Sequence, residues 1–163
     1  RVISAELDFG QGPVLTSSFY VPNGGKDYDA KIRFLTDMDA WAAEAQAAGR
    51  PRLFCGDLNV ALTERDVHPR ERKPNQIGTR DDERALIDRL LSRGLVDIGR
   101  TLHPTDDELF TWWAPWRNLK QRNIGWRIDY IVASPPLAGS AATCVVQREY
   151  GTSDHGPVVA TFA

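Results

Sequence analysis

Residues 52–59 read RLFCGDLN, a short apolar strand that runs directly into a loop with one carboxylate and one amide. Asp57 and Asn59 stand two positions apart, a spacing that places both on the same side of a strand. Such a pair can hold a hard cation or a water molecule, and the amide can donate to a phosphate oxygen. The same residue types also favour a simple turn, because Asp and Asn bond to their own backbone. Taken alone, this stretch leaves the choice between a site and a turn open.

Upstream of this stretch the sequence predicts a hairpin and a helix. Alternation from Ile3 to Phe9, followed by the turn sequence GQGP, predicts a hairpin into a strand over Val14–Val21. Apolar residues then recur at helical spacing from Ile32 to Ala45, and Gly49 is expected to end that helix.

Downstream, an apolar stripe over Leu86–Leu91 predicts a second helix that stops at Gly94. Strand-like patterns follow at Leu109–Trp113, Arg127–Ala133, Thr143–Arg148 and Pro157–Phe162. The alternation of strands and helices favours an α/β (α+β) layered domain, with polar residues gathered at strand ends and in loops.

The composition is that of one globular domain. The chain has 163 residues, of which 42% are hydrophobic and 26% charged. No stretch approaches the roughly 20 apolar residues of a membrane helix, and the first residues lack the layout of a signal peptide. Cys55 and Cys144 have no metal-ligand spacing and are too few for a disulfide framework, which favours a reduced, cytosolic setting.

The charges are unevenly distributed although the net charge is −2. Residues 117–127, RNLKQRNIGWR, hold four basic residues and no acidic one, and residues 65–80 hold five basic residues against two acidic ones. Local basic patches of this kind can steer a polyanion such as DNA. The alternative is that both are ordinary solvated loops.

Asp154 and His155 stand just before the last predicted strand. Histidine is the usual general acid or base near neutral pH, and it needs a partner that fixes its tautomer. Asp129 is the candidate partner, because a carboxylate inside an apolar strand is unfavourable unless it is paired. A histidine alone is more often structural, and the combination of the three residues favours function.

Five blocks of sequence occur in this order: F-Y-V-P-N-G (19–24), G-D-L-N-V-A (56–61), T-W-W (111–113), N-I-G-W-R-I-D-Y (123–130) and S-D-H-G-P-V (153–158). Together they resemble the exonuclease III and class II AP endonuclease family. This family belongs to the wider endonuclease/exonuclease/phosphatase superfamily, and the resemblance runs from Arg1 to Ala163. The G-W-R-I-D-Y and F-Y-V-P-N blocks are particular to the DNA-repair branch, whereas G-D-x-N and S-D-H are shared across the superfamily.

The resemblance implies a four-layered sandwich, in which two packed β-sheets are flanked by helices. It also implies a metal-dependent DNA repair nuclease that cuts the phosphodiester 5′ of abasic sites and trims 3′ ends. The implied cofactor is Mg²⁺, with Mn²⁺ as the alternative. The implied partner is double-stranded DNA with abasic sites or 3′ ends, met by a cytoplasmic, nucleoid-associated monomer with no membrane contact.

The resemblance assigns catalytic roles to five residues. Asp57 would orient or deprotonate the attacking water, and Asn59 would hold the scissile phosphate. His155, oriented by Asp129, would contact that phosphate and support its developing charge or act as base. Tyr20 would touch the phosphate or the leaving 3′ oxygen. The implied metal ligands are Asp57, Asn59, Asp154 and His155.

Further residues would bind the DNA. Trp112 and Trp126 match positions that line the pocket for a flipped abasic sugar, whereas Trp41 and Trp113 are expected in the core. Trp116 would enter the groove on one side. The other expected contacts are Asn23 to a phosphate, Lys26 to the groove from the opposite side, Arg117 and Arg122 in the basic loop, and Asn75 or Gln76 to the backbone.

The sequence departs from the family pattern at its start. Family members carry an earlier Asn motif and a metal-binding Glu on strands that would precede Arg1, and no acidic residue in Glu6–Asp8 has a matching context. We therefore expect a single domain over residues 1–163 that is incomplete at the N-terminus. We expect it to expose an apolar sheet edge and to be inactive when expressed alone.

Two alternative functions remain open from the sequence. The first is a phosphodiesterase of the same superfamily that acts on another substrate, such as a phospholipid or an inositol phosphate. The second is an inactive, truncated fragment that binds DNA.

Overall fold

The computed structural model describes residues 1–8, 10 and 12–163. The end of the predicted alternation at Phe9 and the turn residue Gln11 lie outside the described residues.

A mixed sheet forms the centre of the molecule. Its strand order is β1-β2-β3-β5-β4, with β2 and β3 parallel and the other neighbours antiparallel. A separate antiparallel hairpin pairs β6 with β7. The strands of the main sheet are β1 Val2–Asp8, β2 Pro13–Tyr20, β3 Arg52–Asp57, β4 Val96–Asp97 and β5 Asp129–Ala133, and those of the hairpin are β6 Ala141–Val146 and β7 Val158–Phe162.

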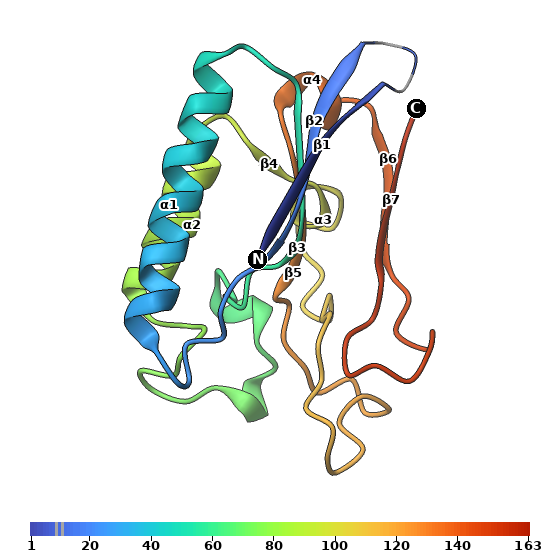
Figure 1. Ribbon diagram of the computed structural model, residues 1–163. Coiled ribbons are helices and arrows are strands. Elements are labelled where there is room, and N and C mark those ends of the chain that lie inside the picture. The colour runs from blue at the N-terminus through green and yellow to red at the C-terminus, as the bar shows by residue number, and fades with distance from the viewer. Residues whose placement is uncertain (9, 11) are drawn as a thin grey trace.

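Two helices lie side by side on one face of the main sheet, and the β6–β7 hairpin lies on the other (Figure 1). The helices are α1 Tyr28–Ala47 and α2 Asp81–Ser92. This layering of helices, sheet and second sheet agrees with the predicted sandwich. The shorter elements are the 3-10 helices Glu64–Asp66 and Pro69–Glu71, α3 Ile98–Leu102 and α4 Pro135–Ala138.

Both long helices begin with capping chemistry that the sequence supplies. The Asp27 carboxylate accepts from the Ala30 amide at 2.8 Å, and it caps α1. The first turn of α2 carries Asp81, Asp82 and Glu83, whose negative charges favour the positive end of the helix dipole. No helix of the described residues is both long and apolar enough to cross a membrane.

The main core lies between the two helices and the sheet. Trp41 of α1 packs against Phe19 of β2 and Phe54 of β3, with ring centroids 5.5 and 4.8 Å away. Trp113 is fully buried in a second hydrophobic cluster, which is formed by residues between Phe110 and Ile124. The prediction that Trp41 and Trp113 are core residues is confirmed.

One predicted strand is absent. The Leu109–Trp113 segment forms only isolated bridges, from Trp112 to Trp126 and to His155. The reason is that the segment bonds to two different loops, because the Trp112 amide donates to the Trp126 carbonyl at 2.9 Å and the Trp113 amide donates to the Asp154 carbonyl at 3.0 Å. It therefore serves as a link between two loops.

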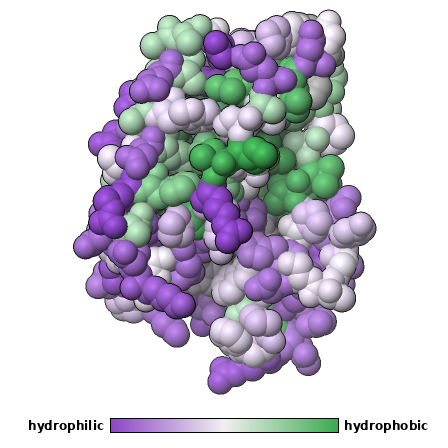
Figure 2. All heavy atoms as spheres, in the orientation of Figure 1, coloured by the Kyte–Doolittle hydropathy of each residue, from purple (hydrophilic) through white to green (hydrophobic). Residues whose placement is uncertain are grey.

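Strand β1 forms one edge of the main sheet and is exposed along its whole length. Its side chains Val2, Ile3 and Leu7 are among the large hydrophobic residues that face solvent, and Ile3 is 73% exposed. Figure 2 shows hydrophobic surface gathered in the middle of the face where Figure 1 draws this strand. The apolar surface of this face is thus concentrated at the sheet edge.

Candidate active site

A cleft of about 420 Å³ opens where strands β2 and β3 end and β5 begins. It is bounded by the loops that follow β2 and β3, by the tryptophan-rich loop and by the segment before β7. The cleft gathers nine of the predicted site residues, namely Tyr20, Asn23, Asp57, Asn59, Trp112, Trp116, Trp126, Asp154 and His155.

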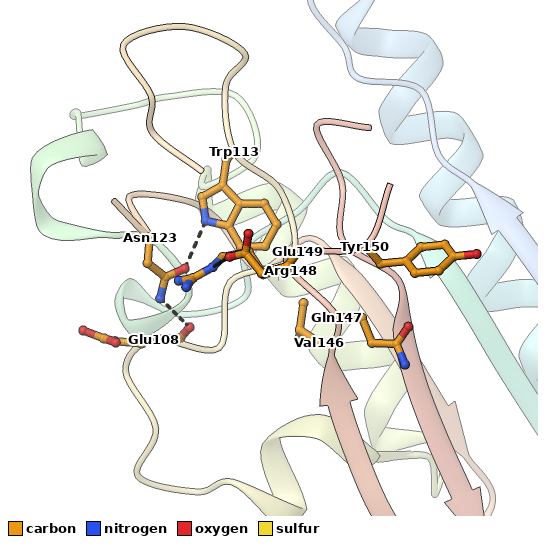
Figure 3. A pocket seen from close by; sticks show the side chains of 8 residues that line it. All are labelled: Glu108, Trp113, Asn123, Val146, Gln147, Arg148, Glu149 and Tyr150. Atoms are coloured by element: carbon orange, nitrogen blue, oxygen red, sulfur yellow. Dashed lines mark hydrogen bonds and ion pairs between the residues drawn. The ribbon is translucent and has the colours of Figure 1, made fainter. Parts of the chain in front are cut away.

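A wider depression of about 680 Å³ lies elsewhere, bounded by Trp113 and by the loop after β6 (Figure 3). Its polar groups bond to each other, since the Trp113 indole N–H donates to Asn123 at 3.1 Å and the Asn123 amide donates to the Glu108 carbonyl at 3.3 Å. It contains none of the residues predicted to be catalytic, so the smaller cleft is the candidate site.

Asp57 and Asn59 form a turn that is also the floor of the cleft. The Asn59 backbone N–H donates to Asp57 Oδ1, and its side-chain Nδ2 donates to Asp57 Oδ2, both at 2.8 Å. Nδ2 also donates to the Val21 carbonyl at 3.0 Å. Asn59 lies in the left-handed region with φ +52°, which Asn tolerates better than most residues. The two interpretations of this stretch, turn and site, therefore describe the same geometry.

The glycine before Asp57 is required by close packing of β2 against β3. Gly56 has φ +128°, and a Cβ there would lie 2.0 Å from the Phe19 carbonyl oxygen. Only glycine fits at this approach. The close contact brings the ends of the two strands together, with Tyr20 opposite Asp57 in the register.

The carboxyl group of Asp57 holds its proton unusually tightly. Burial raises its pKa to about 6, and the negative charge of Asp129, its antiparallel partner in β5, adds to the effect. The Asn59 amide, His155 and Lys31 oppose it. A carboxyl group that titrates near pH 6 is suited to take a proton from water near neutral pH.

The predicted pairing of His155 with Asp129 is present. His155 Nδ1 lies 2.9 Å from Asp129 Oδ2, and a carboxylate partner makes Nδ1 the donor. The ring nitrogen that can meet a ligand in the cleft is therefore Nε2. Asp129 lies behind His155 and also lines a neighbouring cavity of about 620 Å³.

Thr111 holds Asp129 in place and was not among the predicted site residues. Its hydroxyl donates to Asp129 Oδ2 at 2.7 Å and accepts from the Ile128 and Asp129 amides, each at 3.0 Å. In the sequence, Thr111 is the first residue of the T-W-W block, whose tryptophans alone were predicted to bind DNA or to lie in the core. Thr111, Asp129 and His155 thus form one hydrogen-bonded chain.

We predict that the pKa of His155 falls when Asp129→Asn is introduced. Burial lowers this pKa, but the hydrogen bond and the charge of Asp129 outweigh burial and raise it above its usual 6.5. Protonated His155 therefore stabilises the fold fully below pH 6.5, and this contribution is lost as the pH rises through the raised pKa. NMR titration of the ring protons measures the change, and an unchanged pKa in the variant would contradict the pairing.

The tryptophans form one wall of the cleft. Trp112 and Trp126 meet edge to face with ring centroids 6.3 Å apart, and the Trp112 indole N–H donates to Asp154 Oδ2 at 3.0 Å. Trp126 is 7% exposed, whereas Trp116 is 58% exposed at the rim. Tyr20 is also exposed, and the Asn23 side chain donates to Asn59 Oδ1 at 3.3 Å.

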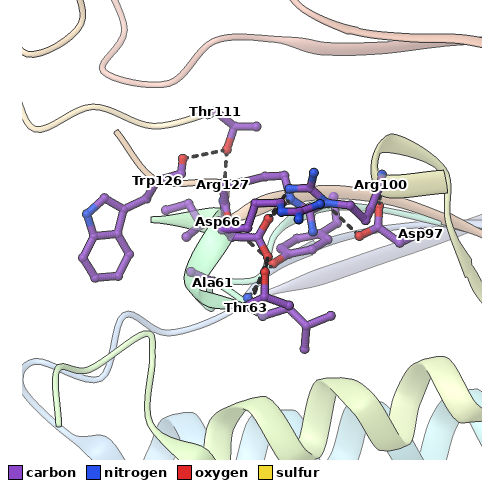
Figure 4. A network of polar contacts seen from close by, with 12 residues as sticks. Ala61, Thr63, Asp66, Asp97, Arg100, Thr111, Trp126 and Arg127 are labelled. Carbon is purple, nitrogen blue, oxygen red and sulfur yellow. Dashed lines mark hydrogen bonds and ion pairs between the residues drawn. The ribbon is translucent and has the colours of Figure 1, made fainter. Parts of the chain in front are cut away.

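Only part of the predicted basic loop is free to contact a ligand. Arg127 is 3% exposed and pairs with Asp66 and Asp97 in an internal network that also includes Arg100 (Figure 4). Lys120 donates to the Ser153 carbonyl at 2.8 Å. Arg127, the last residue of the basic run, is therefore not on the surface under either interpretation of the run, because it compensates buried carboxylates. Arg117 and Arg122 are exposed, as predicted.

The remaining predicted contacts surround the cleft. Lys26 is exposed and does not line the cleft. Of the two residues proposed for a backbone contact, Gln76 lines the cleft, and Asn75 does not.

The predicted four-residue metal set is not assembled as a closed cage. Among the described residues, no group of three or more His, Cys, Asp or Glu side chains is placed to hold a metal ion. His155 Nδ1 is committed to Asp129, and the Asn59 amide is committed to Asp57. Two carboxylates, those of Asp57 and Asp154, line the cleft. These oxygen donors suit Mg²⁺, which is usually bound through one or two carboxylates together with water and substrate phosphates.

A model of the endonuclease/exonuclease/phosphatase family matches residues 4–155. The chain belongs to this family. The match includes every block that forms the cleft, from β2 to His155.

The similar proteins are named as an exodeoxyribonuclease, an AP endonuclease and a 3′ phosphatase. The chain is 32% identical over 161 residues to an exodeoxyribonuclease of Bacillus subtilis, which covers 97% of the chain and 62% of the relative. The fold is similar to that of an AP endonuclease from Archaeoglobus fulgidus, with a TM-score of 0.88 at 30% identity, covering 99% of the chain and 65% of that structure. It is also similar to the 3′ phosphatase NExo from Neisseria bound to a product DNA hairpin, with a TM-score of 0.90 at 27% identity, covering 100% and 65%. The chain thus spans less than two thirds of the length of these family members.

Proposed function

We propose that this chain carries the catalytic cleft of a DNA-repair nuclease that cuts the backbone 5′ of abasic sites and trims 3′ ends. The observation that carries the proposal is the meeting in one cleft of His155, which Asp129 holds from behind, with the pair of Asp57 and Asn59, beside a wall of tryptophans. The names of the relatives, exodeoxyribonuclease and AP endonuclease, support the choice of DNA as substrate.

In this proposal, Asp57 takes the proton of the attacking water. Its pKa of about 6 leaves it mainly ionised at neutral pH and basic enough to accept the proton. The protonated ring of His155, held by Asp129, supports the negative charge that develops on the phosphate oxygens. Tyr20, which lines the cleft, meets the leaving 3′ oxygen in this proposal.

Asn59 has a positioning role in addition to its proposed phosphate contact. Both hydrogens of its amide are used, one by Asp57 and one by the Val21 carbonyl. A phosphate oxygen that enters the cleft can take over the bond now made to Asp57, which would free the carboxylate for the water. Asn59 thus links phosphate binding to the freedom of Asp57 to accept a proton from the water.

We propose that the divalent cation is Mg²⁺, held on the protein side by the carboxylates of Asp57 and Asp154. A cation there neutralises negative charge on the phosphate. Burial and, after it, the negative charge of Asp129 raise the pKa of Asp57, so a cation beside this carboxylate would stabilise its charged form.

The tryptophan wall favours a sugar without a base. Trp112 and Trp126 form an apolar surface beside the catalytic pairs, and a flipped nucleotide would have to fit its base against it. An abasic sugar meets no such obstruction.

The test is cleavage by the full-length protein of three substrates, an abasic duplex, the matched undamaged duplex and a small aryl phosphodiester, with and without EDTA. We expect Mg²⁺-dependent cutting 5′ of the abasic site and removal of nucleotides from 3′ ends. Cleavage of the small diester alone would point to a phosphodiesterase of another class. DNA binding without cleavage in Mg²⁺ would reject the enzyme proposal.

We predict that Arg117→Ala and Arg122→Ala each weaken the salt dependence of binding to an abasic duplex. A variant that makes one phosphate contact fewer releases fewer counterions when it binds. The slope of log K against log salt should therefore become shallower by about 1 in each variant. Arg33→Ala, an exposed arginine on α1, is the matched control and should leave the slope unchanged. Slopes unaffected by both loop variants would show that these arginines do not contact phosphates.

A further inference from the structure

A buried ion pair lies beneath the cleft and joins the two long helices. Lys31 in the first turn of α1 pairs with Glu83 in the first turn of α2, and both side chains are completely buried. Removing two charges from water is so unfavourable that a buried pair adds little stability compared with apolar residues of similar size. The other contacts of the pair are therefore better explained by a role other than stability.

Each partner also bonds to a loop that forms the cleft. Lys31 Nζ donates to the Asn59 carbonyl at 2.7 Å. The Glu83 carboxylate accepts from the Gly78 amide at 2.7 Å and from the Arg80 amide at 3.0 Å. The Ala61 amide in turn donates to the Gly78 carbonyl at 2.7 Å. The pair thus connects the loop after β3 with the loop before α2.

Both connected loops place atoms that the cleft uses. Asn59 has a left-handed backbone and presents its amide to Asp57. Gly78 lies against Trp126, because a Cβ at Gly78 would be 3.1 Å from the indole ring and 3.2 Å from the Asn59 carbonyl oxygen.

A third loop packs on the stem of Lys31. A Cβ at Gly24, the residue that follows Asn23, would lie 3.0 Å from Lys31 Cδ. The loops after β2, after β3 and before α2 therefore all contact one ion pair.

We propose that Lys31 is a positioning residue, which together with Glu83 holds the Asn59 carbonyl and so keeps the Asn59 amide directed at Asp57. Lys31 does not touch the substrate. The rate measurements below rest on the proposed function, whereas the exchange measurement does not.

The first test compares Lys31→Met with the double variant Lys31→Met/Glu83→Gln in the full-length protein. The single variant leaves the Glu83 charge buried without a partner, so both Tm and kcat should fall. The double variant removes both charges and keeps an acceptor for the Gly78 amide, so most of the Tm should return. Its kcat on an abasic duplex should stay about 10- to 100-fold below wild type, with KM nearly unchanged, because misplacement of a reacting group lowers the rate.

The matched control is Asp39→Asn. Asp39 on α1 pairs with Arg93, just beyond α2, at 2.8 Å, and so joins the same two helices away from the cleft. This variant should lower Tm and leave kcat unchanged. A double variant at Lys31 and Glu83 that recovers kcat together with Tm would show that the pair is only structural, and would overturn the proposal.

The second test is amide hydrogen exchange in the metal-free, DNA-free protein. In the double variant, protection should fall at Asn59 and Ala61 while the central amides of α1 and α2 keep theirs. Wild-type protection at Asn59 would also overturn the proposal. If the wild-type protein cuts no DNA, the proposed function fails, and the exchange result still decides whether Lys31 positions Asn59.

Discussion

Replacing His155 with alanine in the full-length protein is expected to lower the rate of cleavage at an abasic site by about 10²–10⁴-fold, the range for loss of a positioned acid or base. Nδ1 of this histidine is held by Asp129, and Asp129 is held by Thr111, so the ring has a fixed orientation and a raised pKa. Single-turnover cleavage measures the rate, and the Kd for the duplex should change little.

The control for this prediction is another histidine. His68 lies outside the cleft lining, where its ring accepts from the Arg70 amide, and His68→Ala should leave the cleavage rate unchanged. Because His155 and Asp129 act as a unit, adding Asp129→Asn to His155→Ala should cost little further rate. Losses that multiply in the double variant would show that the two residues act separately.

Replacing Asn59 with alanine is expected to lower the cleavage rate by about 10²–10³-fold, as removal of a preorganised donor does elsewhere. The variant loses the bond that orients Asp57 and the donor proposed to meet the phosphate. Rate constants with saturating enzyme, together with the Kd for uncut DNA measured in EDTA, separate chemistry from binding. An equal loss in affinity and rate would make Asn59 a binding residue only.

A glycine at the same position separates chemistry from backbone strain. Asn59 has φ +52°, where alanine is strained by roughly 1–2 kcal/mol and glycine is not. Asn59→Gly and Asn59→Ala should therefore lose similar rates, while the alanine variant has the lower free energy of unfolding. A glycine variant with nearly wild-type rate would show that the backbone conformation, and not the amide, is what the site requires.

The sequence predicts the pairing of His155 with Asp129 and the nearness of Asp57 to Asn59 well, because the chemistry is visible in the residues themselves. Asp129 is a carboxylate inside an apolar strand, and such a group needs a partner, which the structure shows to be His155. Asp57 and Asn59 follow a strand directly, and the structure places them in the same cleft.

The sequence predicts charged loops less well, because charge alone does not indicate burial. Arg127 belongs to a basic run but pairs internally with Asp66 and Asp97, which come from distant parts of the chain. The Leu109–Trp113 segment alternates like a strand, yet its partners are two loops that only the complete fold brings to it.

The helical spacing of the sequence is enough to predict that Lys31 is buried. It stands four positions before Leu35 and seven before Met38, so it lies on the apolar stripe of α1 and faces the core. A lysine on such a stripe needs a buried acceptor. Its partner could not be identified from the sequence, because Glu83 is one of several acidic residues at the start of α2.

The position of His155 just before β7 has a consequence for how the protein loses activity. The histidine reaches Asp129 from a segment 26 residues further along the chain, next to a hairpin that is separate from the main sheet. Small structural units of this kind can open while the rest of a protein stays folded. Opening of the β6–β7 hairpin would withdraw His155 and leave α1, α2 and the strand carrying Asp57 intact. On mild heating, the protein is therefore expected to stop cutting DNA before its helical circular dichroism signal declines.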